Sequence, residues 1–203
     1  MYNKIKIIAV TNRKICGSCN INFEEQIKII ANSKIFDKII LREKDLTQDN
    51  YEKLACKIQK ICNNTGTQFF VNSFSEIAEK INSDGLQLPY KKFLDYNKNN
   101  FNKFNGKIAV SVHSVGEAEK AAENNADFLI AGHIFETECK KGLPPRGIEF
   151  LKNIVKSVDI PVYAIGGINA ENAKFCIDAG AAGVCVMSEA MKFKFKFKSK
   201  EWI

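Results

Sequence analysis

A histidine and several charged side chains share one long segment, GHIFETECKKGLPPRG at Gly132–Gly147, which follows a short apolar run. His133 stands near its start, and imidazole is the side chain best suited to moving a proton near neutral pH. A solvated surface loop could be equally polar. Because this segment is long and glycine-punctuated, it is more typical of an active-site lid. The sequence therefore makes His133 a candidate general acid or base.

Two other segments could bind an anion through backbone amides. Gly166 and Gly167 follow an apolar run within IGGI, and Met187 and Ser188 follow another. Paired glycines let N–H groups approach an oxyanion, and a helix beginning just afterwards, at Asn169, would add its positive end. The alternatives are a tight turn that needs positive φ and a helix N-cap at Ser188. In (β/α)8 barrels the loops after strands 7 and 8 often form a phosphate site, which favours phosphate binding.

Two cations and a second histidine also follow apolar runs. Arg42 and Lys44, in LREKD, are two residues apart, so both face the same side of an extended chain. They suit an anionic ligand; the competing interpretation is a surface ion pair between Arg42 and an acid such as Glu43. His113 ends the run VSVHS and shares a strand face with Ser111. A purely structural histidine would fit this pattern equally well.

The composition excludes several kinds of site. Only two His occur in 203 residues, so a poly-His metal site is excluded within one chain. The seven Cys have no paired spacing, and CGSC at Cys16–Cys19 has no second CxxC or CxxH partner, which gives a zinc or redox site little support. No secretory signal and no run of about 18 apolar residues is visible. We therefore expect a reduced, cytoplasmic protein without a metal site and without a membrane partner.

The net charge of +7 gives no support to a nucleic-acid partner. Proteins that read nucleic-acid sequence rely on Arg, because its planar guanidinium matches phosphates and guanine edges. Here 27 of the 30 cations are Lys. A large part of the excess also lies in residues 192–203, KFKFKFKSKEWI, which hold five Lys and one Glu.

Short apolar runs alternate with longer amphipathic stretches along the chain, and these elements must position the candidate residues. The predicted strands are Ile5–Val10, Ile35–Leu41, Gln68–Asn72, Gly85–Leu88, Ile108–His113, Phe128–Ala131, Val162–Ile165 and Gly183–Met187. The predicted helices are Phe23–Ala31, Tyr51–Cys62, Ser75–Ile81, Val115–Asn124, Ile148–Lys156 and Asn169–Ala179. The Asn- and Lys-rich stretch at Tyr90–Phe101 forms the fourth connection.

This alternation predicts an α/β fold, a single compact (β/α)8 TIM barrel over residues 1–191. A doubly wound open sheet is the competing architecture, and in both the chemistry belongs at the carboxyl ends of the strands. Residues 192–203 form a basic-aromatic tail with a strand period. It could add to a partner's sheet edge, cover a gap beside the eighth strand, or fray.

Several motifs, taken in order, resemble the thiamine phosphate synthase/TenI superfamily from the first strand to about Met191. They are LREKDL, VN at Val71–Asn72, GLQLP, VSVHS, AIGGINAENA and AGAAGVCVMS. The lid sequence resembles the TenI branch, the thiazole tautomerases. That resemblance implies an isomerase of thiamin biosynthesis that aromatises a thiazole carboxylate phosphate tautomer by moving a proton, without a cofactor. A full eighth helix is normal in this superfamily, so the chain has a shortened or atypical one. A homodimer, common in the superfamily, is expected.

The resemblance also implies roles for individual residues. His133 would be the general acid/base, and Arg42 would bind the substrate carboxylate with Lys44 nearby. Backbone amides would hold the phosphate of the small thiazole substrate, at Gly166, Gly167, Met187 and Ser188. Supporting roles would fall to Asn72, Ser111, His113 and Lys140.

The synthase branch joins hydroxymethylpyrimidine diphosphate to a thiazole phosphate with Mg²⁺, and this chain departs from its pattern. Asn72-Ser73 replaces an Asn-Asp pair, and Pro89-Tyr90 follows GLQL without the second metal Asp. Ile40 stands where the synthase has Gln, and His133 where it has Pro. Because Mg²⁺ needs hard oxygen ligands, these losses favour the tautomerase. The alternatives are the synthase itself and a non-catalytic regulatory protein that binds thiazole or thiamin phosphate.

Overall fold

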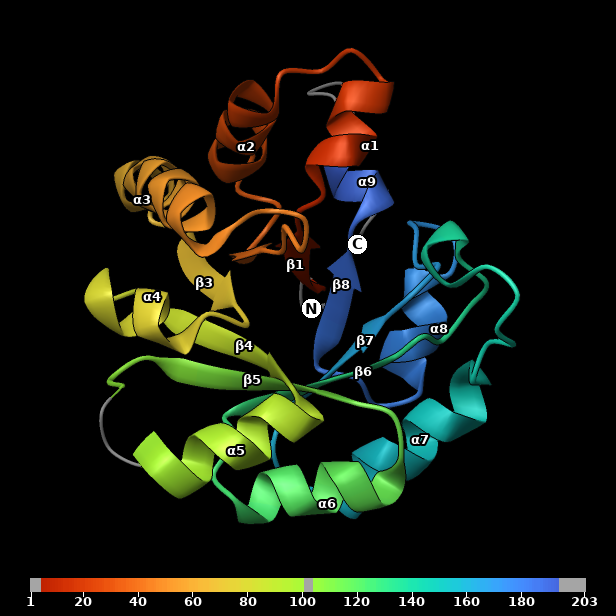
Figure 1. Cartoon of the computed structure of the whole chain (residues 1–203). Helices are drawn as coiled ribbons and strands as arrows, with labels where there is room; N and C mark the ends of the chain where they lie inside the picture. Colours follow the sequence, from red (N-terminus) through yellow and green to blue (C-terminus); the bar gives the residue numbers. More distant parts are fainter. Residues whose placement is uncertain (1–4, 101–103, 194–203) are drawn as a thin grey trace.

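Eight parallel strands close into a barrel in chain order, and helices cover its outside (Figure 1). The computed structural model describes residues 5–100 and 104–193. The strands are β1 (Lys6–Val10), β2 (Lys38–Leu41), β3 (Gln68–Asn72), β4 (Gly85–Pro89), β5 (Lys107–Val112), β6 (Phe128–Gly132), β7 (Val162–Ile165) and β8 (Gly183–Val186). The predicted TIM barrel is confirmed. The open-sheet alternative is wrong, because β1 pairs with β8 through Ile7 and Val184.

The helices lie between the strands, with one short 3-10 turn, η1 (Glu138–Lys140), after β6. They are α1 (Arg13–Ser18), α2 (Phe23–Asn32), α3 (Gln48–Thr65), α4 (Ser75–Lys80), α5 (Tyr90–Asn100), α6 (Val115–Glu123), α7 (Gly147–Ser157), α8 (Ala173–Asp178) and α9 (Ser188–Met191). None of the helices in the described ranges is long and apolar enough to cross a lipid bilayer.

The starts of β2 and α8 differ from the predictions by three or more residues for local reasons, and one helix was not predicted. β2 begins at Lys38 rather than Ile35, because Ile35 and Phe36 pack in the outer core before the strand starts. α8 begins at Ala173 rather than Asn169, because the Asn169 side chain accepts hydrogen bonds from two following backbone amides and forms a turn. Helix α1 is unpredicted; its first turn is capped by the Asn12 side chain, which accepts from the Lys14 amide.

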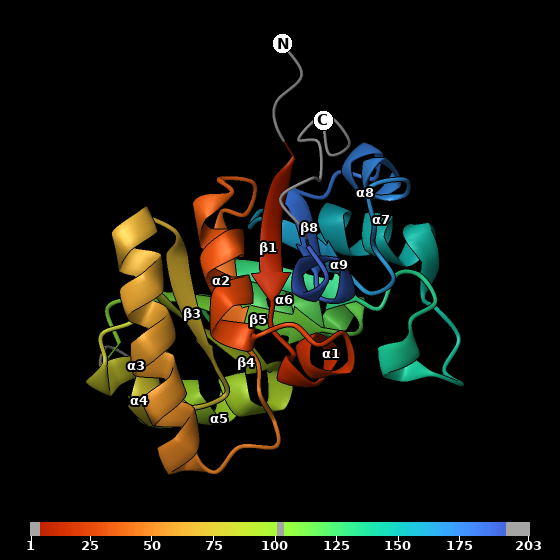
Figure 2. The ribbon, with the colours of Figure 1, turned by 90° about the horizontal axis from the view of Figure 1, so that it is seen from above.

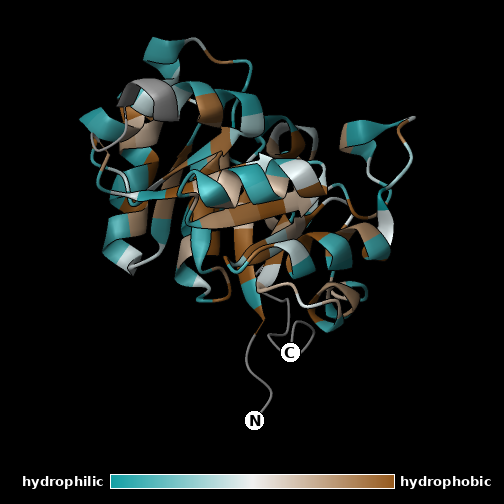
Figure 3. Ribbon diagram, turned by 90° about the horizontal axis from the view of Figure 1, so that it is seen from below, coloured by the Kyte–Doolittle hydropathy of each residue, from teal (hydrophilic) through white to brown (hydrophobic). Residues whose placement is uncertain are grey.

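Alternate residues along each strand face the barrel interior and the helix layer. In β1, Ile8 lies in the interior cluster while Ile7 lies in the cluster shared with the helices. Figure 3 shows this core as brown strands behind helices whose outer faces are largely teal. Inside the barrel, the ring of Phe128 packs edge-on against Phe70 at 5.6 Å and Tyr163 at 5.2 Å between centroids. Gly85 makes room for them, since a Cβ there would lie 2.0 Å from the Phe70 ring.

The described chain ends close to α2. After β8 it forms only the single turn α9, and Phe193 then packs edge-on against Phe36, with ring centroids 5.3 Å apart. The side-chain amide of Gln26 donates to the carbonyl oxygens of Ala190 and Phe193, both at 2.8 Å. The predicted division at residue 191 stays a prediction, because residues 194–203 of the tail lie outside the described residues.

Tyr51 ties the ends of β2 and β3 together, which gives a test of the fold. Its buried hydroxyl donates to the Leu41 carbonyl at 2.5 Å and accepts from the Asn72 amide at 2.9 Å. We expect Tyr51→Phe to lower the free energy of unfolding by about 1–3 kcal/mol, because both backbone groups lose their partner. Equilibrium urea denaturation measures this. Tyr90→Phe is the control, since the Tyr90 hydroxyl has no hydrogen bond within the described residues. Equal losses in the two variants would contradict the assignment.

Candidate active site

One cavity of about 560 Å³ opens at the carboxyl ends of the strands, and every candidate residue from the sequence lines it. Figure 2, seen from above, places α1 and the loop around η1 at this same end of the barrel. The structure thus brings together residues that are far apart in the chain: Arg42, Lys44, Asn72, Ser111, His113, His133, Lys140, Gly166, Gly167, Met187 and Ser188.

The cavity floor is apolar, with a polar ladder on one side. Inward-facing side chains of five strands form the floor: Val10, Ile40, Ile130, Ile165 and Cys185. Across the ends of β3, β4 and β5, Asn72 Nδ2 donates to Gln87 Oε1, and Gln87 Nε2 donates to Ser111 Oγ at 2.8 Å. Gln87 is a site residue that the sequence reasoning missed. Its signal was a polar side chain at an inward position of a buried strand.

Backbone hydrogen bonds join the two ends of the lid, Gly132–Gly147, to each other. The Arg146 amide donates to the His133 carbonyl, and the Gly147 amide donates to the Ile134 carbonyl, both at 3.0 Å. The Ile134 amide in turn donates to the Ile165 carbonyl of β7 at 2.9 Å. These bonds hold the start of the lid against the strand that leads into the glycine loop.

His133 is buried, with 6% of its surface exposed. Its Nε2 lies 3.3 Å from the Leu143 carbonyl oxygen, near the tip of the lid. Because a carbonyl oxygen can only accept, Nε2 is the donor in this contact. Nδ1 is itself buried and has no hydrogen-bond partner within the described residues. The ring is therefore held through Nε2, while Nδ1 keeps no partner among the described residues.

The glycine loop packs directly on the lid. Gly166 has φ of 104° and Gly167 has φ of 65°, so the tight turn expected from the sequence is present. A Cβ on Gly166 would lie 2.3 Å from the His133 Cβ, and one on Gly167 would lie 2.2 Å from the Glu136 carbonyl oxygen. Only glycine permits this close approach. Because α8 starts at Ala173, no helix follows the loop directly, which corrects the expected contribution of a helix end.

The end of β8 completes this side of the cavity. Met187, not Ser188, occupies the N-cap position of α9, and no side chain caps that helix. The simple capping interpretation of Ser188 is therefore wrong. Cys139 Sγ of the lid lies 3.8 Å from Met187 Sδ, so the lid also contacts this loop.

Arg42 and Lys44 both face the cavity and make no ion pair with any described residue. The alternative pair between Arg42 and Glu43 does not form, because Glu43 turns the other way and contacts Arg13. Arg42 lowers the pKa of Lys44 below its ordinary value, with smaller contributions from burial and Lys140. The cations thus repel one another, and an anion between them would relieve the repulsion.

His113 lies at the rim, half-exposed. Its Nδ1 is 3.6 Å from Glu117 Oε2, the same oxygen that accepts from the His113 amide at 2.7 Å. Burial, followed by the nearby Lys140, lowers its pKa, while Glu117 opposes the shift. This pairing gives His113 a structural role that His133 lacks.

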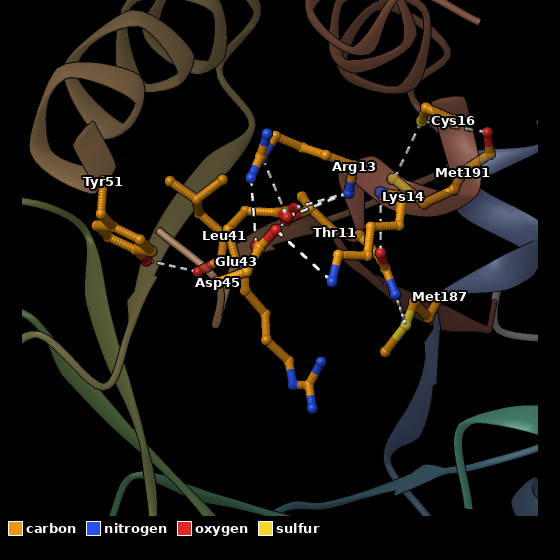
Figure 4. Close-up of polar contacts among 12 residues, drawn as sticks. Thr11, Arg13, Lys14, Cys16, Leu41, Glu43, Asp45, Tyr51, Met187 and Met191 are labelled. Atoms are coloured by element: carbon orange, nitrogen blue, oxygen red, sulfur yellow. Dashed lines mark hydrogen bonds and ion pairs between the residues drawn. The ribbon is translucent and has the colours of Figure 1, made fainter. Parts of the chain in front are cut away.

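The CGSC segment lies away from the cavity. Cys16 is buried in α1, with its Sγ 3.7 Å from Met191 Sδ (Figure 4). Cys19 is exposed. Burial raises the pKa of Cys16 to about 11, so this thiol is protonated near neutral pH. Cys16 is accordingly a packing residue.

Comparison with known proteins agrees with this geometry. The family model for thiamine monophosphate synthase matches residues 7–190. The chain belongs to the thiamine monophosphate synthase family. It is 35% identical to the thiamine-phosphate synthase of Fusobacterium nucleatum over 196 residues, covering 93% of this chain and 90% of that one. It is 32% identical to a putative thiamine-phosphate synthase 2 of Aquifex aeolicus, covering 90% and 96%.

A solved structure shows the same barrel. The thiamine phosphate pyrophosphorylase of Pyrococcus furiosus superposes with a TM-score of 0.81 at 27% identity, covering 98% of this chain and 94% of that one. As a member of the thiamine monophosphate synthase family, the protein is an enzyme of thiamin biosynthesis.

The magnesium that the synthase branch uses does not fit the residues at the ends of β3 and β4. Asn72 and Ser73 follow β3, and the Asn72 amide is already bound to Gln87. Pro89 closes β4 without a carboxylate. The carboxylates that line the cavity come from the lid and α9 instead, and no three His, Cys, Asp or Glu side chains among the described residues group as a metal site.

Proposed function

We propose that this enzyme is a thiazole tautomerase, which aromatises a thiazole carboxylate phosphate tautomer by proton transfer. One observation carries the proposal: His133, with a buried and unpartnered ring nitrogen, shares a cavity with a glycine loop and two unpaired cations. This set provides a proton acceptor and two separate anion sites. The substrate, with one phosphate and one carboxylate, needs all three.

Each group has a distinct role in the proposed reaction. Backbone amides at Gly166, Gly167, Met187 and Ser188 hold the phosphate, and Arg42 holds the carboxylate with Lys44 beside it. His133 takes a proton from one carbon and returns it to another. One C–H bond breaks and another forms, with no net gain or loss of electrons, so no redox partner is required.

The decisive experiment is incubation of the purified protein with the tautomer, followed by ultraviolet absorbance of the aromatic thiazole. We expect the absorbance to rise at a rate proportional to enzyme concentration. A flat trace from folded protein that still binds thiazole phosphate would instead support a non-catalytic binding protein. The homodimer and the cytoplasmic location remain predictions; sedimentation velocity tests the first.

A synthase activity is the second candidate, because the relatives compared above are named thiamine-phosphate synthases or pyrophosphorylase. Metal dependence separates the two. We expect excess EDTA to leave the aromatisation rate unchanged, because the proposed proton transfer uses only side chains and backbone amides. We also expect no thiamin phosphate from hydroxymethylpyrimidine diphosphate, thiazole phosphate and Mg²⁺. Magnesium-dependent formation of thiamin phosphate would establish the synthase instead.

A further inference from the structure

Glu43 stands between Arg42 and Lys44 in the sequence, but its buried carboxylate points away from the cavity that those two cations line. Glu43 is only 3% exposed and is surrounded by Thr11, Arg13 and the segment that follows β2 (Figure 4). Its two oxygens each accept from the Arg13 amide at 3.1 Å, and Oε2 lies 3.4 Å from Arg13 Nε. Neither Arg42 nor Lys44 contacts it.

Thr11 connects this carboxylate to Arg42. The Thr11 hydroxyl donates to Glu43 Oε1 at 2.7 Å and accepts from the Arg42 amide at 3.0 Å. The Thr11 amide also donates to the Ile40 carbonyl at 3.0 Å. The end of β2 is thus held to the junction of β1 and α1 by both its backbone and the Glu43 side chain.

The direction of Glu43 determines the direction of its neighbours. Arg42 and Glu43 follow β2 directly, so their side chains point to opposite sides, and Glu43 then opens a turn through Lys44 in which the Leu46 amide donates to the Glu43 carbonyl at 3.4 Å. Anchoring Glu43 outward therefore fixes the backbone that carries Arg42 and Lys44 on the cavity side. Burying the Glu43 carboxylate is energetically unfavourable, because burial favours its neutral form and raises its pKa. Hydrogen bonds from Thr11 and Arg13 oppose this shift by favouring the carboxylate. Removing the partners of a buried charge is strongly destabilising, so the carboxylate and its donors stay together.

We propose that Glu43 is a positioning residue that, with Thr11, holds Arg42 and Lys44 in place to bind the anionic group of the ligand. The identity of that group as a carboxylate rests on the proposed function, but the positioning does not. Glu43 touches no reacting atom. It acts through the backbone that carries the Arg42 and Lys44 side chains.

Glu43→Gln tests the proposal with inorganic pyrophosphate as the probe, measured by calorimetry, because a cation pair binds it whatever the enzyme's reaction. The amide offers one acceptor where the carboxylate offers two and turns an NH₂ group toward the Arg13 donors. We expect the Kd to rise about 10- to 100-fold, since displacement by about 1 Å has effects of this size. Arg42→Ala should weaken binding at least as much, and Glu43→Asp should restore part of the affinity lost in Glu43→Gln.

The matched control is Asp45→Asn, which removes the exposed partner of the same Arg13 at 3.2 Å and leaves Glu43 untouched. It should bind pyrophosphate as the wild type does. For the tautomerase reaction, Glu43→Gln should raise KM while kcat changes little, a split that general loss of structure would not produce. If Glu43→Gln fails to fold, Thr11→Val decides, because it removes only the bridging hydroxyl; its Kd should also rise.

Wild-type affinity for pyrophosphate in folded Glu43→Gln, or in Thr11→Val, would overturn the proposal, as would a wild-type protein that does not bind pyrophosphate. Weakened pyrophosphate binding in a protein that leaves the tautomer unchanged would preserve the positioning role and refute the proposed function. The two inferences therefore fail separately.

Discussion

Replacing His133 by Asn is expected to lower kcat for aromatisation of the thiazole tautomer by about 10²–10⁴-fold, the usual contribution of a positioned acid or base. Asn keeps a polar side chain that can reach the Leu143 carbonyl, but it cannot take up a proton near neutral pH. KM should change little, because the phosphate and carboxylate sites are formed by other residues. The rate is read from the ultraviolet absorbance of the aromatic product.

His113→Asn is the matched control for this experiment. His113 lines the same cavity but is paired with Glu117 at the rim, so its loss should leave kcat near the wild-type value. A wild-type rate in His133→Asn would refute the acid/base assignment. A large loss in His113→Asn with none in His133→Asn would transfer the role to the other histidine.

Gly166→Ala is expected to have the second largest effect, on both stability and rate. Alanine at this position would have to keep φ near 104°, and its methyl group would lie 2.3 Å from the His133 Cβ. Backbone strain of this kind costs about 1–3 kcal/mol, and displacement of the imidazole should lower kcat/KM about 100-fold. Urea denaturation measures the first effect and steady-state kinetics the second.

Gly142→Ala separates the two causes. Gly142 also has positive φ, at 83°, but a Cβ there would meet nothing within 4 Å. It should therefore lose stability without losing activity. If both variants keep wild-type kcat/KM, the contact between Gly166 and His133 does not position the imidazole.

The strands could be predicted from the sequence because the pattern that marks them, a short run of apolar residues, is local and recurs in every strand. Both faces of each barrel strand are buried, so the runs are apolar throughout, as in Ile7–Val10. The errors arose where the packing partner is distant. Ile35 and Phe36 look like strand residues but cover the outside of the core, where Phe36 meets Phe193. The true start of α8 depends on the Asn169 side chain, whose hydrogen bonds compete with the helix.

The site was predictable to a similar extent. Its residues were recognisable as polar or glycine positions directly after apolar strands, and the barrel topology gathers such positions at one end. Two features were not. Glu43 looked like a partner for Arg42, and its actual partners, Thr11 and Arg13, lie on another strand end. The contact that holds His133 through Nε2 comes from a carbonyl at Leu143 that only the folded lid brings close.

Two parts of the lid contact or hold His133: its two ends, and the stretch around Leu143. Backbone hydrogen bonds at the base, from the Arg146 and Gly147 amides, hold the segment that carries the imidazole, whereas the Leu143 carbonyl contacts its Nε2. Because the Leu143 contact is made by a backbone carbonyl, a side-chain substitution there keeps the acceptor, whereas a change in the length of this part of the loop would move it. The outer side chains of this loop can therefore vary while its backbone contacts to His133 stay in place.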